Sequence, residues 1–293
     1  FNLYAVWEAL THLSTLSPRG AVIWEVRGAN GRITHLLGAD RTYINKVAQV
    51  FRAHGDIQFR EVNSESRTPV RLARQLKVTK PVLSLNTNLA QSVIRAGLAA
   101  MVESRNGTEI VLQVVLGRGF APSPVPTNLS DPHATWLEVI FGSVSKATTE
   151  ARKTIREKAE QHGFEAAIRI GVSDEKANSR LCSLISALRV LESAGVRIHD
   201  ETEKLEKINS AHVPWSFPLR LSVKELASFL LLPAGDEQLP GTPGLHPKLT
   251  LPPMWYRQPT NQQNDRTFAI SMDMSPKKLS ISPRDSLEHT HLM

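Results

Sequence analysis

The chain has 293 residues, of which 41% are hydrophobic and 22% charged, a composition typical of a globular protein with one or two domains. No stretch approaches the roughly 20 consecutive apolar residues of a membrane-spanning helix. Lys and Arg number 35 against 28 Asp and Glu, so the net charge is +7, which permits contact with nucleic acid or an anionic membrane surface without requiring either. The chain begins at Phe1 without an initiator Met or a signal peptide, so we expect it to be part of a longer polypeptide.

The first predicted elements are a hairpin and a helix. Residues 21–37 form two alternating runs around Asn30 and Gly31, a pair that favours a tight turn. Residues 42–62 then predict a helix that begins after Thr42 and ends at Gly55, followed by a strand from Ile57. The apolar positions of this helix have helical spacing: Ile44, Val47, Ala48 and Phe51.

Two further strand-helix-strand units follow, in residues 81–117 and 165–200. In the first, the expected helical face consists of Leu89, Val93, Ala96, Ala100 and Met101, and a strand runs from Glu109 to Leu116. In the second, the helix has the clearest apolar stripe of the chain, formed by Leu181, Leu184, Ile185, Leu188 and Leu191, and it ends at Gly195. Between these units, the sequence Ser130-Asp131-Pro132 predicts the start of a long helix, from about Ala134 to His162, closed by Gly163.

The character of the sequence changes after His212. Ser222 and Glu225 have the spacing of a capping box at the start of a short helix that stops at Pro233. The repeated prolines and glycines of residues 233–259 favour an extended linker. Strand character returns in residues 266–271 and 277–282.

These elements predict an α/β (α+β) fold, with ferredoxin-like strand-helix-strand units in a mixed sheet, helices packed on the sheet and a Pro-rich C-terminal extension. We expect four regions. They are a first α/β half with an N-terminal helix and the hairpin (1–130), a long helix with the second half (131–212), a short helix with the linker (213–260) and a β segment (261–293).

The sequence lacks the motifs whose chemistry is easiest to recognise. It contains no G-x-x-x-x-G-K-[ST], G-x-G-x-x-G, G-x-S-x-G, H-E-x-x-H or paired C-x-x-C. Gly117 and Gly119 predict a turn at a strand end, since no lysine or helix start follows them. His289 and His291 could share one strand face, but two histidines without a third ligand predict no metal site. We expect Cys182, the one cysteine, to be a buried structural thiol in a reducing compartment.

One cluster of basic residues has the composition of a nucleic-acid contact: Lys146, Arg152, Lys153, Arg156 and Lys158. Glu150, Glu157 and Glu160 interrupt it, and such alternation is typical of a solvated helix face with i, i+4 ion pairs. The aromatic content of 6% provides few platforms on which bases could stack. The solvated face is therefore the favoured interpretation.

Residues 217–293, about a quarter of the chain, resemble the region just upstream of the ATPase core in actinobacterial conjugative DNA-transfer and type IV secretion motors, which are relatives of the TraG, FtsK and HerA translocases. The matching residues of the earlier element are Leu221, Ser222, Glu225, Leu226 and Pro233; those of the later one are Ser282, Pro283, Arg284, Asp285, Leu287, His289 and His291. In the motors, the later stretch leads into the P-loop. The P-loop itself, the Walker B carboxylate and any arginine finger do not occur here.

The resemblance implies a non-catalytic N-terminal domain of a translocation ATPase, which serves assembly and the docking of substrate or partners. It implies no catalytic residue, cofactor or metal in this chain, with ATP and Mg²⁺ bound by the C-terminal RecA-like domain of the same polypeptide. The implied partners are that domain, other secretion and conjugation proteins, DNA bound weakly, and further copies in a hexamer. The implied location is the cytoplasm, at the cytoplasmic face of the membrane.

Two other classes of function stay open from the sequence. One is a free-standing basic α/β module that binds nucleic acid. The other is a small-molecule enzyme on a ferredoxin-like scaffold, although no converging acid and base residues can be named for it.

Overall fold

The computed structural model describes residues 2–16, 20–55, 57–62, 67–102, 107–125, 129–132, 146–233, 239–242, 266–270 and 278–281. The chain divides into two compact units, Phe1–Leu245 and His246–Met293. In chain order, the helices of the first unit are α1 (Leu3–Thr15), α2 (Ile44–His54), η2 (Thr87–Leu89), α3 (Ala90–Val102), α5 (Thr149–Ala159), η3 (Glu175–Ala177), α6 (Asn178–Arg189), α7 (Leu205–Asn209) and α8 (Val223–Phe229). Its strands are β1 (Val22–Ala29), β2 (Arg32–Ala39), β3 (Leu72–Val78), β4 (Ile110–Phe120), β5 (Gly163–Val172), β6 (Ile198–Thr202) and β7 (Leu219–Ser222).

These strands form one seven-stranded sheet in the order β2-β1-β4-β5-β3-β6, with β7 paired to β5. Every pairing among the described strands is antiparallel. The segment β3-α3-β4-β5-α6-β6 has the chain order of a ferredoxin-like unit, and its strands lie in the sheet order β4-β5-β3-β6. The predicted α/β (α+β) class, with helices packed on a sheet, is therefore confirmed, but the sheet is antiparallel and not mixed. Both expected halves contribute strands to this single unit.

The hairpin β1–β2 extends the sheet beyond β4. Asn30 and Gly31 both have positive φ values, 49° and 77°, as a two-residue hairpin turn of type I′ requires. The predicted turn is therefore confirmed. The pairing of β1 with β4 over Val22↔Leu116 to Gly28↔Ile110 then makes the hairpin part of the main sheet.

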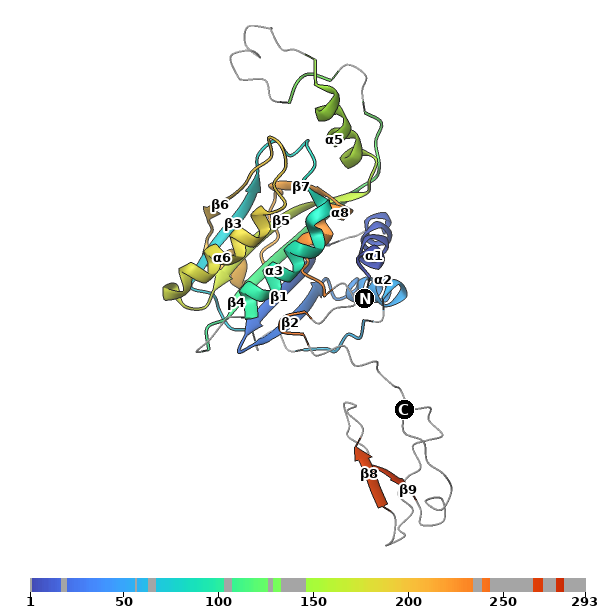
Figure 1. The fold of residues 1–293 in the computed structure, drawn as a ribbon, viewed down its shortest axis with the longest axis vertical. Helices are drawn as coiled ribbons and strands as arrows, with labels where there is room; N and C mark the ends of the chain where they lie inside the picture. The colour runs from blue at the N-terminus through green and yellow to red at the C-terminus, as the bar shows by residue number, and fades with distance from the viewer. Residues whose placement is uncertain are drawn as a thin grey trace. The chain divides into compact units, whose positions relative to one another are not determined.

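Helices α3 and α6 cross one face of the sheet (Figure 1). The predicted stripe of α6 is confirmed, because Leu181, Leu184, Ile185, Leu188 and Leu191 are all buried. At α3 the expected face is confirmed in part: Val93 and Met101 are buried as predicted, but Ala96 and Ala100 are half-buried and Leu89 is 40% exposed. Ile94, Gly97 and Leu98 also belong to the buried face. Gly28 of β1 lies directly under this helix, because an added Cβ would lie 2.5 Å from the Met101 carbonyl oxygen.

The structure corrects four further predictions about elements. The strand before α3 is β3, which the sequence analysis did not assign, because its alternation of Leu, Arg, Gln and Lys is only partly apolar. Residues 57–62 form no strand. The chain is not one helix from 134 to 162: Lys146 forms an isolated β-bridge with Ser130, and α5 begins after Thr148, whose side chain accepts a hydrogen bond from the Ala151 N–H. Gly163 begins β5 rather than closing a helix.

The second unit contains a hairpin of β8 (Arg266–Ile270) and β9 (Lys278–Ile281), which are antiparallel. The strands expected in residues 266–271 and 277–282 are thereby confirmed. Most of the predicted linker, and the residues around His289 and His291, lie outside the described residues. Within the described ranges, no helix is long and apolar enough to cross a membrane.

Candidate functional site

The basic residues of the candidate nucleic-acid contact do not form a single surface. Lys146 precedes α5 and is exposed, and Arg152 is half-buried. Lys153 and Arg156 are exposed on α5, where they lie 4.0 Å and 3.9 Å from the carboxylates of Glu157 and Glu160. Because an acid lies beside both Lys153 and Arg156, this face of α5 is a weak candidate for phosphate contacts.

Lys158 is in a different environment, and its interpretation as a nucleic-acid contact is wrong. Its ammonium group is buried, 3.0 Å from the carboxylate of Glu225, and it also donates to the Leu83 carbonyl. Glu225 is fully buried; it accepts hydrogen bonds from the N–H groups of Ser222 and Leu85 and completes the predicted capping box of α8. Lys158 therefore holds α5 to the core through a carboxylate that already has a structural role.

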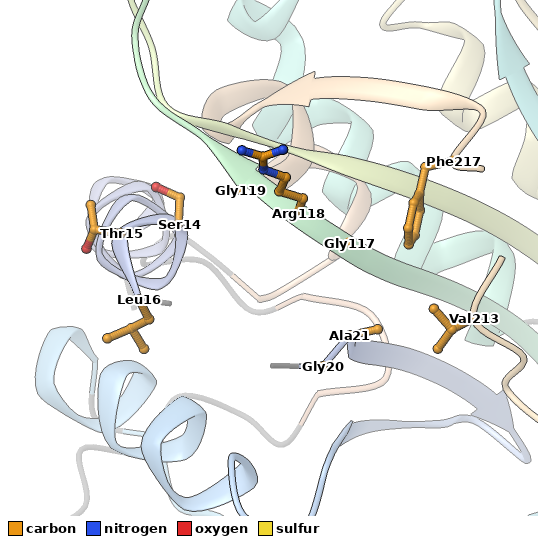
Figure 2. A pocket seen from close by; sticks show the side chains of 10 residues that line it. All are labelled: Ser14, Thr15, Leu16, Gly20, Ala21, Gly117, Arg118, Gly119, Val213 and Phe217. Carbon is orange, nitrogen blue, oxygen red and sulfur yellow. The ribbon is translucent and has the colours of Figure 1, made fainter. Parts of the chain in front are cut away.

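An open groove of about 590 Å³ lies at one end of β4. Its lining residues come from the end of α1, the start of β1, the end of β4 and the loop before β7: Ser14, Thr15, Leu16, Gly20, Ala21, Gly117, Arg118, Gly119, Val213 and Phe217. Figure 2 shows the α1 residues at one end of the groove, Val213 and Phe217 at the other, and the Arg118 side chain between them.

A β-bulge shapes this groove. The register of β4 against β5 shifts between Leu116 and Gly119, so an extra residue enters β4. The prediction of a turn at Gly117 and Gly119 is therefore wrong, because the strand continues through both to Phe120. The two glycines also admit close neighbours: an added Cβ would lie 2.4 Å from the Phe217 ring at Gly117, and 2.6 Å from the Ser14 carbonyl oxygen at Gly119.

The edge of β4 that faces the groove is open in the described structure. The last pairing with β1 is Val22↔Leu116, and among the described residues no strand pairs with Arg118, Gly119 or Phe120 on this side. Arg118 is exposed, and Arg220 lies over the Phe120 ring, 4.2 Å from its centroid. The groove thus combines an open strand edge, apolar walls and positive charge.

The loop that forms the far wall presents two exposed apolar side chains. Val213 is 44% exposed and Trp215 is fully exposed, whereas Phe217 covers Gly117. Tryptophan combines a large apolar surface with one donor, and it is enriched in the energetically dominant positions of protein interfaces. The loop therefore has the composition of a contact surface.

A buried network of charged groups holds α7, the helix that precedes this loop, on the sheet face opposite α3 and α6. Glu25 accepts hydrogen bonds from Arg27, Arg67 and Gln113. Arg67 and Gln113 in turn donate to the carbonyl of Ile208 in the last turn of α7, and Arg67 also donates to that of Asn209. The network thereby satisfies carbonyl groups at the C-terminus of α7 that have no partner within the helix.

Arg169 continues the network toward the N-terminus of α7. Its side chain is completely buried, donates to Gln113 and to the Lys207 carbonyl, and lies 3.6 Å from the Glu203 carboxylate. Burial lowers the pKa of Arg169, while Glu203 acts in the opposite direction. Burial alone would raise the pKa of Glu203, but hydrogen bonds from Lys207 and the Lys204 N–H leave it lowered. These charges hold the ends of α7, so the network is structural.

Neither the groove nor the network is predicted by the sequence, because both form from segments far apart in the chain. The residues Glu25 and Arg27 alternate with apolar ones in β1, which was the one available signal that this sheet face is polar. Cys182 also differs from its prediction: it is exposed, since it lies one position off the buried stripe of α6.

Comparisons of the chain with protein-family models, with curated proteins and with solved structures found no match.

Proposed function

We propose that the chain is a non-catalytic N-terminal domain of a conjugative DNA-transfer or type IV secretion ATPase, and that it serves assembly and the docking of partners. The observation that carries the proposal is the position of the residues that resemble those motors. Leu221 and Ser222 end β7, and Glu225 and Leu226 are fully buried in α8. The segment with the resemblance is thus an integral part of the first unit.

The buried contacts of Glu225 explain how this integration supports the proposal. They join α8 to α5 through Lys158 and to the segment before α3 through Leu85. A strand-helix element that only linked two domains would not need a buried ion pair, which costs desolvation energy. In the proposed motor, a mechanical force on the chain after α8 would therefore be transmitted to the sheet through these contacts.

The groove provides the docking function within this proposal. We assign to it an extended segment of a partner secretion protein, with an apolar side chain for the Phe217 wall and an acidic one for Arg118. An extended peptide can add to an open strand edge through main-chain hydrogen bonds, with pockets for its alternate side chains. In this proposal the domain works at the cytoplasmic face of the membrane in a hexameric parent, which binds ATP and Mg²⁺ in its RecA-like domain.

Two polypeptides test the main proposal: the present chain, and the same chain continued by about 250 residues, an ordinary domain length. Both are assayed for nucleotide binding and for Mg²⁺-dependent phosphate release. Phosphoryl transfer needs a P-loop, its lysine and a Walker B carboxylate, so only the longer polypeptide should be active. Turnover of ATP by the short chain, or a parent sequence without G-x-x-x-x-G-K-[ST] after Met293, would contradict the proposal.

The docking groove has a separate test in cells that carry the parent protein. Val213→Asp and Arg118→Glu, both in the lining of the groove, should lower the frequency of DNA transfer at least tenfold, since a dominant interface residue contributes 2 kcal/mol or more, about a 30-fold change in affinity. Protein abundance should not change, because both side chains are exposed. Val190→Ala is the matched control, because Val190 caps the C-terminus of α6, is 42% exposed and is not among the residues that line the groove. Unchanged transfer in both groove variants would contradict the assignment.

A further inference from the structure

Helix α7 has few apolar contacts with the sheet on which it lies. Of its five residues only Ile208 is buried, and Ile208 belongs to a small apolar cluster that is separate from the main core. Leu205, at the start of the helix, is 40% exposed. On the opposite face of the sheet, α6 buries four apolar side chains in the main core. The hydrophobic effect therefore contributes much less to the attachment of α7 than to that of α6.

Side-chain hydrogen bonds supply most of the attachment of α7. Arg67, Gln113 and Arg169 donate to its last carbonyl groups, at distances between 2.9 and 3.3 Å. The Asn209 side chain accepts a hydrogen bond from the N–H of Val70 and donates one to its carbonyl. When such bonds break, water replaces the lost partners, and buried charges regain the hydration that burial costs them. Release of α7 from the sheet should therefore cost less free energy than release of α6.

The chain leaves α7 through a residue with an unfavourable backbone conformation. Ala211 has a φ of 52°, in the left-handed region that disfavours any residue with a Cβ. The N–H of Ala211 donates to the Ile208 carbonyl, and that of His212 donates to the Lys207 carbonyl. These two bonds form a Schellman motif, in which the left-handed position is usually occupied by glycine. The attached position of α7 thus includes backbone strain that its release would remove.

The segment that begins with α7 is fixed at both ends. Before the helix, the N–H of Glu203 donates to the Ala73 carbonyl. After the loop, Leu219 begins β7, which pairs with β5. Between these points, Val213 and Phe217 form the far wall of the groove (Figure 2). Movement of this segment would therefore displace a wall of the groove while β6 and β7 keep their places in the sheet.

We propose that residues 204–217 form a lid, which opens as one unit when α7 leaves the sheet and closes again while the main core stays folded. Opening exposes the polar face of the sheet to water and moves the far wall of the groove, so the lid sets the width of the groove. This motion is a property of the folded chain and does not depend on the proposed function.

A thiol buried beneath α7 measures the opening of the lid in the purified chain. Val111 is completely buried in the cluster that contains Ile208. In a chain with Cys182→Ser, the thiol of Val111→Cys should therefore react with a thiol reagent when the lid opens or when the whole chain unfolds. Val93→Cys is the matched control, because Val93 is equally buried but lies in α3 and in the main core. We expect the thiol at position 111 to react roughly 100-fold faster or more, since local opening is more frequent than global unfolding.

Two substitutions in the lid should change this reaction rate in opposite directions. Ala211→Gly should slow the reaction about 3- to 10-fold, because the strain that it removes from the closed state exceeds the backbone entropy that Gly adds to the open state. Asn209→Ala should speed the reaction about tenfold, because it removes both hydrogen bonds to Val70. Asn30→Gly, at a positive φ in the β1–β2 turn, should leave the rate unchanged. Equal reaction of the two buried thiols, or unchanged rates in both lid variants, would overturn the proposal.

Discussion

Charged residues occupy two contrasting regions of this protein, the network beneath α7 and the exposed face of α5. In the network, Glu25 is only 3% exposed, and its carboxylate receives hydrogen bonds from three side chains. On α5, the side chains of Lys153 and Arg156 are 75% and 69% exposed, and each is near one acid at about the limit of an ion pair. The net charge of the chain therefore does not indicate which charged residues stabilise the fold. Burial distinguishes the two regions, and the following predictions test that distinction.

The largest expected effect is at Glu25. Glu25→Ala would leave Arg27 and Arg67 without their shared carboxylate, and the loss of one partner from a buried ionic network costs about 3–5 kcal/mol of unfolding free energy. The control is Glu201→Ala, because Glu201 lies in the same row of residues across the sheet but is exposed and pairs with Lys77 at the surface. It should change stability by less than about 0.5 kcal/mol. Equal effects in urea denaturation would contradict the distinction.

Lys158 tests the distinction within a single helix. Lys158→Met would leave Glu225 buried and unpaired, for an expected loss of about 2–3 kcal/mol, somewhat less than at Glu25 because Glu225 keeps its backbone donors. Lys153→Met on the exposed face should change stability by about 0.5 kcal/mol or less. Adding Glu225→Gln to Lys158→Met should recover part of the loss, since a neutral side chain needs no counter-ion. No recovery in the double variant would mean that Lys158 acts through packing alone.

His35 extends the comparison to a half-buried residue whose two ring nitrogens are buried. Burial lowers the pKa of His35 from 6.5 to about 4, and neither ring nitrogen has a hydrogen-bond partner among the described residues. In the unfolded chain His35 is protonated below about pH 6.5, whereas in the folded chain it is protonated only below about pH 4. Protons therefore bind the unfolded state preferentially between these values, and the free energy of unfolding should fall as the pH decreases from 6.5 to 4. We expect a loss of about 2 kcal/mol, because the residue keeps part of its surface in solvent. His35→Phe should remove this part of the pH dependence; an unchanged profile would contradict it.

The smallest expected effect is on DNA binding by α5. The chain should bind duplex DNA weakly and without sequence preference, with an affinity that falls steeply as salt rises. Lys153→Ala with Arg156→Ala should reduce the slope of log K against log[salt] by at most about 0.9 for each lost phosphate contact. Fluorescence anisotropy at several salt concentrations measures this slope. Tight binding at high salt, or selection of one sequence, would favour the alternative of a nucleic-acid-binding module.

The sequence predicted those parts of the fold whose cause is local. Asn30 and Gly31 specify their turn through backbone conformation, and Ser222 with Glu225 specifies a helix start through two hydrogen bonds. The stripe of α6 follows from helical periodicity alone. These features need no information from distant segments, so a single sequence is sufficient to predict them.

The predictions were wrong where tertiary contacts determine the secondary structure or the environment of a residue. β3 carries polar residues at alternate positions and is defined as a strand by pairing with β5 and β6. The candidate site residues depend on tertiary contacts in the same way. In sequence, Lys158 is one member of a charged run, and only the fold shows that it pairs with Glu225 of another helix.

The hydrogen bond from the Trp24 indole to the Leu230 carbonyl oxygen, 3.1 Å long, joins residues 206 positions apart and has a consequence for synthesis on the ribosome. The strand that contains Trp24 emerges early, whereas its partner Leu230, the C-cap of α8, is made 206 residues later. At about 5–20 residues per second, the interval between the two is roughly 10–40 s. During this time the apolar face of β1 lacks its final cover, so the nascent chain should depend on chaperones until the segment after β7 is complete.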